Sequence, residues 1–246
     1  MNEKNIMLVI QYLGTNFSGS QMQLNERTVQ GEIEIALEIA FDKKIKTTFS
    51  GRTDSGVHAK KQVINFRVET KIPTDKIKYF LRRFFPDDIF VVSSKEVDMS
   101  FNSRFDANER NYRYYIHQKE DLFLNQRSFL YNKDIDIEKL NGIAKKYLLG
   151  KKNFKSFCAS RSTVTSYICD LTVLKFYRIA ETEIYLEIRA NRFLHNMVRI
   201  LVSLLLDINE GKINKDDIID ILAKEDRREA PKTGSPIGLY LWDVKY

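Results

Sequence analysis

Apolar residues recur with two different periods in the first hundred residues of the chain. Short β-prone runs alternate with longer stretches whose apolar side chains share one helical face. The predicted elements are a strand at residues 6–13, a helix at 28–41, strands at 46–50 and 62–68, a helix at 74–85 and a strand at 89–97. This order, β-α-β-β-α-β, is the ferredoxin-like arrangement that RNA-recognition modules also use.

A similar order recurs in the rest of the chain, without repetition of the sequence itself. The predicted elements are a strand at residues 111–117, a helix at 135–149, strands at 167–177 and 182–190, helices at 193–207 and 215–223, and a strand at 238–244. We therefore predict an α+β fold of two ferredoxin-like (RRM-like) halves, residues 1–105 and 106–246. Mainly antiparallel sheets of the two halves are expected to meet at a central cleft, the default place for a site.

Charge points toward a polyanionic partner. The 40 Lys and Arg residues exceed the 33 Asp and Glu residues, so the formal net charge is +7. Such a balance favours nucleic acid as a partner, although an ordinary basic surface explains the charge equally well.

Other classes of protein lack their usual signals. Cys158 and Cys169 are too far apart for a C-x-x-C pair and are expected to be reduced thiols. The phosphate-loop, dinucleotide-binding, H-E-x-x-H and zinc-deaminase motifs are missing from the sequence. The N-terminus does not resemble a signal peptide, and charges interrupt the apolar stretch at residues 193–208. A cytoplasmic protein without a membrane span is therefore expected.

Residues 51–59, Gly-Arg-Thr-Asp-Ser-Gly-Val-His-Ala, place Asp54 between two glycines in a predicted loop, with Arg52 and His58 close by. Carboxylate, guanidinium and imidazole groups on one tight turn are typical of a reactive site. A structural Asx turn explains the same residues, and from the residues alone it is the preferred interpretation.

Two further groups of residues have both a functional and a structural interpretation. His195 and Arg199, four residues apart on a predicted apolar helix, require a carboxylate, water or phosphate partner if buried, or reach solvent along the helix surface. Tyr112 and Tyr114 alternate with Arg113 after Arg110, which suits base stacking and phosphate binding but equally suits a half-buried strand.

The nine residues 51–59 resemble the catalytic loop of TruA-type tRNA pseudouridine synthases. Four other segments resemble segments of that family in the same order, which extends the likeness over nearly the whole chain. They are residues 28–31, 101–114, 191–199 and 238–241.

The resemblance implies cofactor-free isomerisation of uridine in tRNA, on the 3′ side of the anticodon stem-loop. Asp54 is the implied nucleophile, and it attacks either the ribose or the base. Arg199 is the implied ion-pair partner, since a nearby cation favours an ionised carboxylate. Tyr112 is expected to stack on the target base and to take the C5 proton.

The resemblance also implies roles in RNA binding. Arg52 is expected to fill the space that the flipped nucleotide leaves, and Arg104 and Arg110 to contact RNA. For His58 and His195 a structural or phosphate-contacting role is expected rather than a catalytic one. Family members are homodimers, so tRNA and a second copy of the chain are the expected partners, with no small-molecule cofactor.

Three positions depart from the family pattern. Ser20 stands where a Trp is usual, Asn102 replaces a common His, and Thr165 stands where an Arg is frequent. These changes avoid the proposed catalytic trio but are expected to alter RNA contacts. A divergent enzyme with another target uridine in tRNA or rRNA, or a non-catalytic RNA-binding protein, is therefore the alternative.

Overall fold

The computed structural model describes residues 2–159 and 164–246, which divide into two units. Unit 1 comprises Met1–Asn108 with Tyr240–Tyr246, and unit 2 comprises Glu109–Leu239. The last seven residues thus group with unit 1, whereas the sequence placed residues 106–246 together. Pairing between strands causes this difference, because Tyr240 and Leu241 align in parallel with His58 and Ala59.

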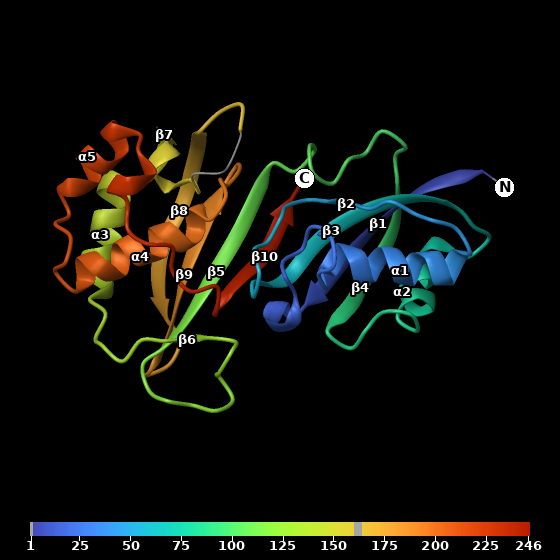
Figure 1. Ribbon diagram of the computed structural model, residues 1–246, viewed down its shortest axis with the longest axis horizontal. Helices are drawn as coiled ribbons and strands as arrows, with labels where there is room; N and C mark the ends of the chain where they lie inside the picture. The colour runs from blue at the N-terminus through green and yellow to red at the C-terminus, as the bar shows by residue number, and fades with distance from the viewer. Residues whose placement is uncertain (1, 160–163) are drawn as a thin grey trace. The chain divides into compact units, whose positions relative to one another are not determined.

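Unit 1 contains the β-α-β-β-α-β order that the sequence predicted (Figure 1). Its elements are β1 (Glu3–Tyr12), η1 (Gly14–Asn16), α1 (Val29–Phe41), β2 (Thr48–Phe49), β3 (His58–Glu69), α2 (Thr74–Leu81), β4 (Ile89–Val97) and β10 (Leu239–Lys245). Strand β1 lies between β4 and β3 and is antiparallel to both, while β2 and β10 pair with β3, antiparallel and parallel respectively.

Alternating apolar residues build the core of unit 1. Ile6 and Leu8 on β1 align with Phe66 and Ile64 on β3, and all four are at most 2% exposed. Phe41 of α1 then packs against both Phe66 of β3 and Phe80 of α2, with ring centroids 6.3 Å and 5.6 Å apart. Both helices therefore cover the same face of the sheet.

The strands of unit 2 belong to the same ten-stranded sheet as those of unit 1, in the order β5-β9-β8-β7 with antiparallel neighbours, and β6 pairs in parallel with β5. Its elements are β5 (Glu109–His117), β6 (Phe129–Leu130), α3 (Ile137–Tyr147), β7 (Gly150–Asn153), η2 (Lys155–Phe157), β8 (Ile168–Arg178), β9 (Glu183–Ala190), α4 (Met197–Asn209), α5 (Asp217–Lys224) and η3 (Arg227–Glu229). The predicted α+β class is confirmed, but one large mixed sheet stands in place of the two predicted sheets, because backbone pairing continues from strand to strand along the order β4-β1-β3-β10-β5-β9-β8-β7. No helix in the described ranges is long and apolar enough to cross a bilayer.

Two element boundaries differ from the prediction in ways that matter for the site. Strand β3 begins at His58, so His58 and Ala59 belong to the sheet and not to the preceding loop. Helix α4 begins at Met197 and not at residue 193, because Asn196 has the left-handed backbone angles φ 63° and ψ 1°. The short strands β6 and β7 were not predicted, since two to four residues carry too little periodicity.

Candidate active site

Asp54 lies on a loop, residues 51–57, that is held from beneath by a second loop, residues 14–20. The backbone N–H of Ser20 donates to the carbonyl of Thr53 (3.0 Å), and the N–H of Thr53 donates to Oγ of Ser20 (2.8 Å). One residue further along, the hydroxyl of Ser55 donates to the carbonyl of Phe17 (3.2 Å). The residues on both sides of Asp54 are therefore fixed, while Asp54 itself is half-buried.

Two glycines allow the loops to approach so closely. A Cβ atom on Gly14 would lie 2.0 Å from the carbonyl oxygen of Val57, a separation that no side chain tolerates. Gly19 has a φ of +100°, and its added Cβ would lie 3.0 Å from the carbonyl oxygen of Thr53. The loop under Asp54 thus depends on glycine at both positions.

Tyr12, at the end of β1, supports the loop from the sheet. Its hydroxyl shares a hydrogen bond of 2.8 Å with Oγ1 of Thr53, and the ring is only 3% exposed. Burial raises the pKa of the Tyr12 phenol to about 12, against the opposing effect of hydrogen bonds with Thr53 and Gln62. Tyr12 therefore stays neutral and continues to hold Thr53 at any physiological pH.

His58, the residue that follows the loop of Asp54, is packed in the interior of unit 1. Its Nδ1 accepts a hydrogen bond from the N–H of Gly14 (3.1 Å), and its ring stacks on Tyr240 with centroids 4.6 Å apart. The side chain is 0% exposed. Of the two roles expected for His58, the structural one fits this position, whereas a fully buried ring offers nothing to a phosphate.

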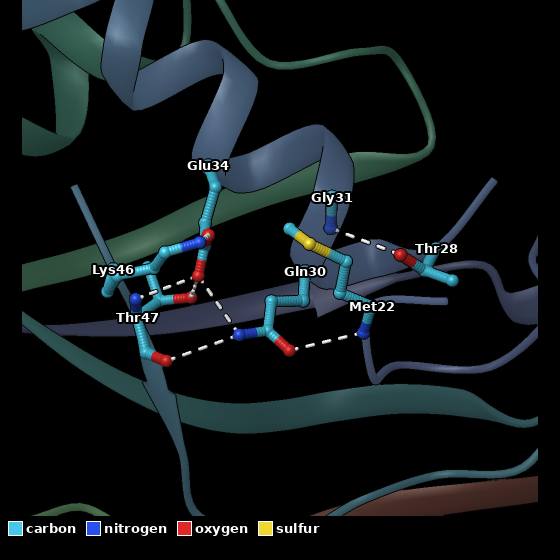
Figure 2. A network of polar contacts seen from close by, with 7 residues as sticks. All are labelled: Met22, Thr28, Gln30, Gly31, Glu34, Lys46 and Thr47. Carbon is cyan, nitrogen blue, oxygen red and sulfur yellow. Dashed lines mark hydrogen bonds and ion pairs between the residues drawn. The ribbon is translucent and has the colours of Figure 1, made fainter. Parts of the chain in front are cut away.

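Helix α1 braces both segments that lead to the loop (Figure 2). Oε1 of the buried Glu34 accepts hydrogen bonds from the N–H (2.9 Å) and hydroxyl (3.0 Å) of Thr47, just before β2. It also accepts from the amide of Gln30 (2.9 Å), whose own Oε1 accepts from the N–H of Met22 (3.2 Å). Because the backbone N–H of Gln30 also donates to the carbonyl of Ser20 (3.0 Å), α1 holds both the loop 14–20 and the segment that enters β2.

Tyr112 is placed on β5 of unit 2. It is 8% exposed and meets Phe193 edge to face, with ring centroids 5.1 Å apart. Arg110, two residues earlier, donates from Nη1 to the carbonyl of Asn191 (2.9 Å). Strand β5 thus packs against residues 191–193. Both segments resemble the tRNA pseudouridine synthase family in sequence, and the structure brings them into contact.

Arg199 is half-buried on the first turn of α4. Its Nε donates to the carbonyl of Gly234 (2.8 Å) and its Nη1 to Oδ1 of Asn196 (3.2 Å). Tyr114 donates to the next carbonyl in this segment, that of Ser235 (3.1 Å). Burial raises the pKa of Tyr114, and the charge of Arg199 opposes that shift.

The other predicted residues have diverse surroundings. Arg52 and Arg104 are exposed on unit 1, and His195 is exposed on unit 2. His195 precedes α4, so the prediction that it shares a helix face with Arg199 was wrong; the left-handed Asn196 separates them. Asp54 belongs to unit 1 and Arg199 to unit 2, and their ion pair stays a prediction.

Sequence reasoning missed the residues that hold the loop, namely Tyr12, Ser20 and Thr53. Ser20 was noticed only as a departure expected to alter RNA contacts. Its side chain is instead 1% exposed and bonded to the residue before Asp54. In residues 2–159 and 164–246, no three His, Cys, Asp or Glu side chains lie close enough together to hold a metal ion.

A rigid loop that presents one carboxylate is a feature of enzymes, and comparison with known proteins identifies the class. The family model described as tRNA pseudouridine synthase matches residues 8–106 and 144–246. The chain belongs to the tRNA pseudouridine synthase family and is an isomerase. The family and the enzyme class predicted from the sequence are thus confirmed.

Individual relatives agree over the full length. The protein named tRNA pseudouridine synthase A from Thermoanaerobacter sp. (strain X514) is 40% identical over 99% of this chain and 100% of its own. The protein of the same name from Brevibacillus brevis is 39% identical, with the same coverage. Among solved structures, a Cbf5-Nop10-Gar1 complex aligns at a TM-score of 0.35 and 10% identity, over 82% of this chain and 53% of that one.

Proposed function

We propose that the chain isomerises uridine to pseudouridine in tRNA, with Asp54 as the nucleophile. The observation that carries the proposal is the clamped loop, which fixes the backbone on both sides of Asp54 and leaves its carboxylate half-buried. Attack at the ribose or the base breaks the bond between C1′ and N1. The base then turns, C5 bonds to C1′, and the bond to Asp54 breaks. C5 loses its proton and N1 gains one, which leaves pseudouridine and the free carboxylate.

The other residues support this reaction from two ferredoxin-like halves. Arg199 pairs with Asp54 and keeps it ionised, and Tyr112 stacks on the base and takes the C5 proton. Arg52 fills the space of the flipped nucleotide, while Arg104, Arg110 and His195 contact RNA. Relatives at about 40% identity carry tRNA in their names, which supports tRNA as the substrate.

The proposed target lies on the 3′ side of the anticodon stem-loop, the proposed location is the cytoplasm, and the working form is a homodimer. Thr165 is exposed and Asn102 forms a turn with Arg104, so both departures from the family pattern could change which uridine is the target. Mapping pseudouridine on total tRNA by carbodiimide labelling and primer-extension stops distinguishes the two targets.

Replacing Asp54 by Asn tests the nucleophile. Asp54→Asn keeps the size of the side chain and one acceptor oxygen but removes the negative charge, so no pseudouridine should form while tRNA binding persists. Product is measured on tRNA transcripts and binding by fluorescence anisotropy. Asp42→Asn is the matched control, because Asp42 ends α1 in a left-handed conformation that Asn also adopts. Activity of Asp54→Asn equal to that of the parent rules out the role of Asp54.

A further inference from the structure

Unit 1 has a polar hollow of about 430 Å³. It lies where the end of α1, the entry to β2, the second half of β3 and residues 100–102 come together. Lys43, Lys44, Lys46 and Arg67 contribute four cationic side chains to its lining, and Glu3 contributes the one carboxylate there. The lining is thus strongly positive, as a polyanion requires.

Lys43 and Lys44 are the cations best placed to meet a ligand. Both are exposed and follow the left-handed residue Asp42 that ends α1. Lys46 already pairs with Glu34 (3.2 Å), and Arg67 donates to the carbonyl of Met99 (2.9 Å). The two adjacent lysines therefore carry most of the attraction that the hollow exerts on phosphate groups.

A network of buried amides fixes the floor of the hollow. Nδ2 of Asn65 donates to Oδ1 of Asn5 (3.0 Å), and Nδ2 of Asn5 donates to the carbonyls of Asp98 (2.9 Å) and Phe101 (3.0 Å). Oδ1 of Asn65 accepts from the N–H of Ser103 (2.9 Å). Because these bonds tie residues 98–103 to the sheet, the hollow is preformed.

An exposed aromatic residue follows this segment directly. Oδ1 of Asn102, which lines the hollow, accepts from the N–H groups of Arg104 (3.0 Å) and Phe105 (3.2 Å). The turn so formed leaves Phe105 77% exposed, with the Arg104 guanidinium 5.5 Å from its ring centroid. An exposed aromatic ring beside a cation is suited to stacking an unpaired base.

The hollow and the loop of Asp54 lie at different places along β3. Asn65 lines the hollow, whereas His58, which follows the loop, lies seven residues earlier on the strand. At about 3.3 Å per residue, these two positions on β3 are about 23 Å apart. The start of the loop lies nearer, because Nε2 of Gln62 donates to the carbonyl of Gly51 (2.8 Å). The hollow therefore lies beside the loop and suits a part of the RNA other than the target uridine.

We propose that the hollow and Phe105 form a second RNA-binding site, which holds the backbone and one unpaired base of tRNA outside the stem-loop that carries the target uridine. This inference rests on the proposed function, because it takes tRNA as the substrate. The site contributes affinity for the whole tRNA and leaves the chemical step unchanged.

Charge reversal at the two lysines tests the backbone contact. Lys43→Glu/Lys44→Glu should weaken binding of a full tRNA transcript by about tenfold and reduce the salt slope of log Kd by about 2, since each lost phosphate contact removes about 0.9. Binding of the isolated stem-loop and kcat at saturating tRNA should stay at the parent values. Lys145→Glu/Lys146→Glu, an exposed pair on α3, is the control for an equal change in net charge.

Removal of the ring tests the stacked base. Phe105→Ala should weaken tRNA binding by about tenfold without changing the salt slope, and Phe105→Tyr should retain affinity, because base stacking needs a ring but no charge. Melting temperatures and molecular masses of the variants establish that folding and assembly are intact.

Two outcomes overturn the proposal. In one, the Lys43/Lys44 variant binds tRNA as tightly as the Lys145/Lys146 control, with the same salt slope. In the other, the isolated stem-loop loses as much affinity as the full tRNA, which assigns the lysines to recognition of the target itself. If the parent protein forms no pseudouridine, the proposed function is contradicted instead. The tRNA-binding measurements on the lysine and Phe105 variants still test whether the hollow binds RNA.

Discussion

The loop of Asp54 depends on single atoms of residues that carry no chemistry themselves. Oγ of Ser20 accepts from the N–H of Thr53, and the missing Cβ of Gly19 lets the two backbones approach. A displacement of about 1 Å at a reacting group lowers a rate by up to about 100-fold. We therefore expect Ser20 to act as a positioning residue for the proposed nucleophile, because it holds the residue before Asp54.

Removal of the Ser20 hydroxyl should lower the rate more than it weakens binding. Ser20→Ala leaves the buried N–H of Thr53 without its acceptor, which costs about 1–3 kcal/mol and loosens the loop. We expect kcat to fall by about tenfold with a smaller change in KM, measured by pseudouridine formation on a tRNA transcript.

Ser18→Ala is the matched control, because the Ser18 hydroxyl bonds Glu26 on the same loop but does not contact residues 51–57 through any bond seen in the described chain. An unchanged kcat in Ser20→Ala, with only a lower melting temperature, makes Ser20 a purely structural residue.

At the level of elements, α1 acts as a brace as well as a core helix. One oxygen of Glu34, Oε1, accepts three hydrogen bonds: two from Thr47, which join α1 to the entry of β2, and one from Gln30 within α1. The other oxygen, Oε2, meets Lys46, whose side chain is 84% exposed. Because an exposed ion pair contributes little, the acceptor atom matters more than the charge.

Two substitutions of Glu34 should therefore lower the free energy of unfolding by different amounts. Glu34→Gln keeps an acceptor at the position of Oε1 and should lower the free energy of unfolding by less than about 1 kcal/mol, the value of an exposed pair. Glu34→Ala leaves the amide of Gln30 and both donors of Thr47 without their acceptor and should cost about 2–4 kcal/mol. Urea unfolding measures both, and equal losses contradict the argument.

Across the whole molecule, the proposed catalytic residues come from both units. Asp54 belongs to unit 1, and Tyr112 and Arg199 belong to unit 2. The hydrogen bonds of Arg199 with Gly234 and Asn196 fix the direction of its side chain within unit 2. The proposed reaction therefore depends on residues of both units.

Arg199→Ala should therefore lower turnover much more than tRNA binding. Loss of the proposed ion pair with Asp54 is expected to reduce kcat by about 100-fold, while tRNA Kd is expected to rise by less than about threefold, because one phosphate contact at most is lost. Both are measured on one tRNA transcript, with Arg178→Ala on unit 2 as the control. Equal losses of binding and turnover identify Arg199 as an RNA contact instead.

The helices and longer strands were predictable from sequence because their periodicity is local. Strand β4 spans the predicted residues 89–97, and α1 begins one residue after its predicted start, Thr28, which caps the helix by accepting from the N–H of Gly31. The start of β3 at His58 and the start of α4 at Met197 were not predictable from sequence. The pairing of β3 and the left-handed conformation of Asn196 depend on contacts with residues that are distant in the sequence.

The sequence by itself determined the α+β class, the loop that carries Asp54 and the family, since each depends on residue order within a segment. Only the tertiary structure decided that β10 joins unit 1, that His58 is buried beneath Gly14, and that Ser20 holds Thr53. The reason is physical: these contacts join residues 33 to 182 positions apart, and a local pattern of side chains does not encode which distant backbone it will meet.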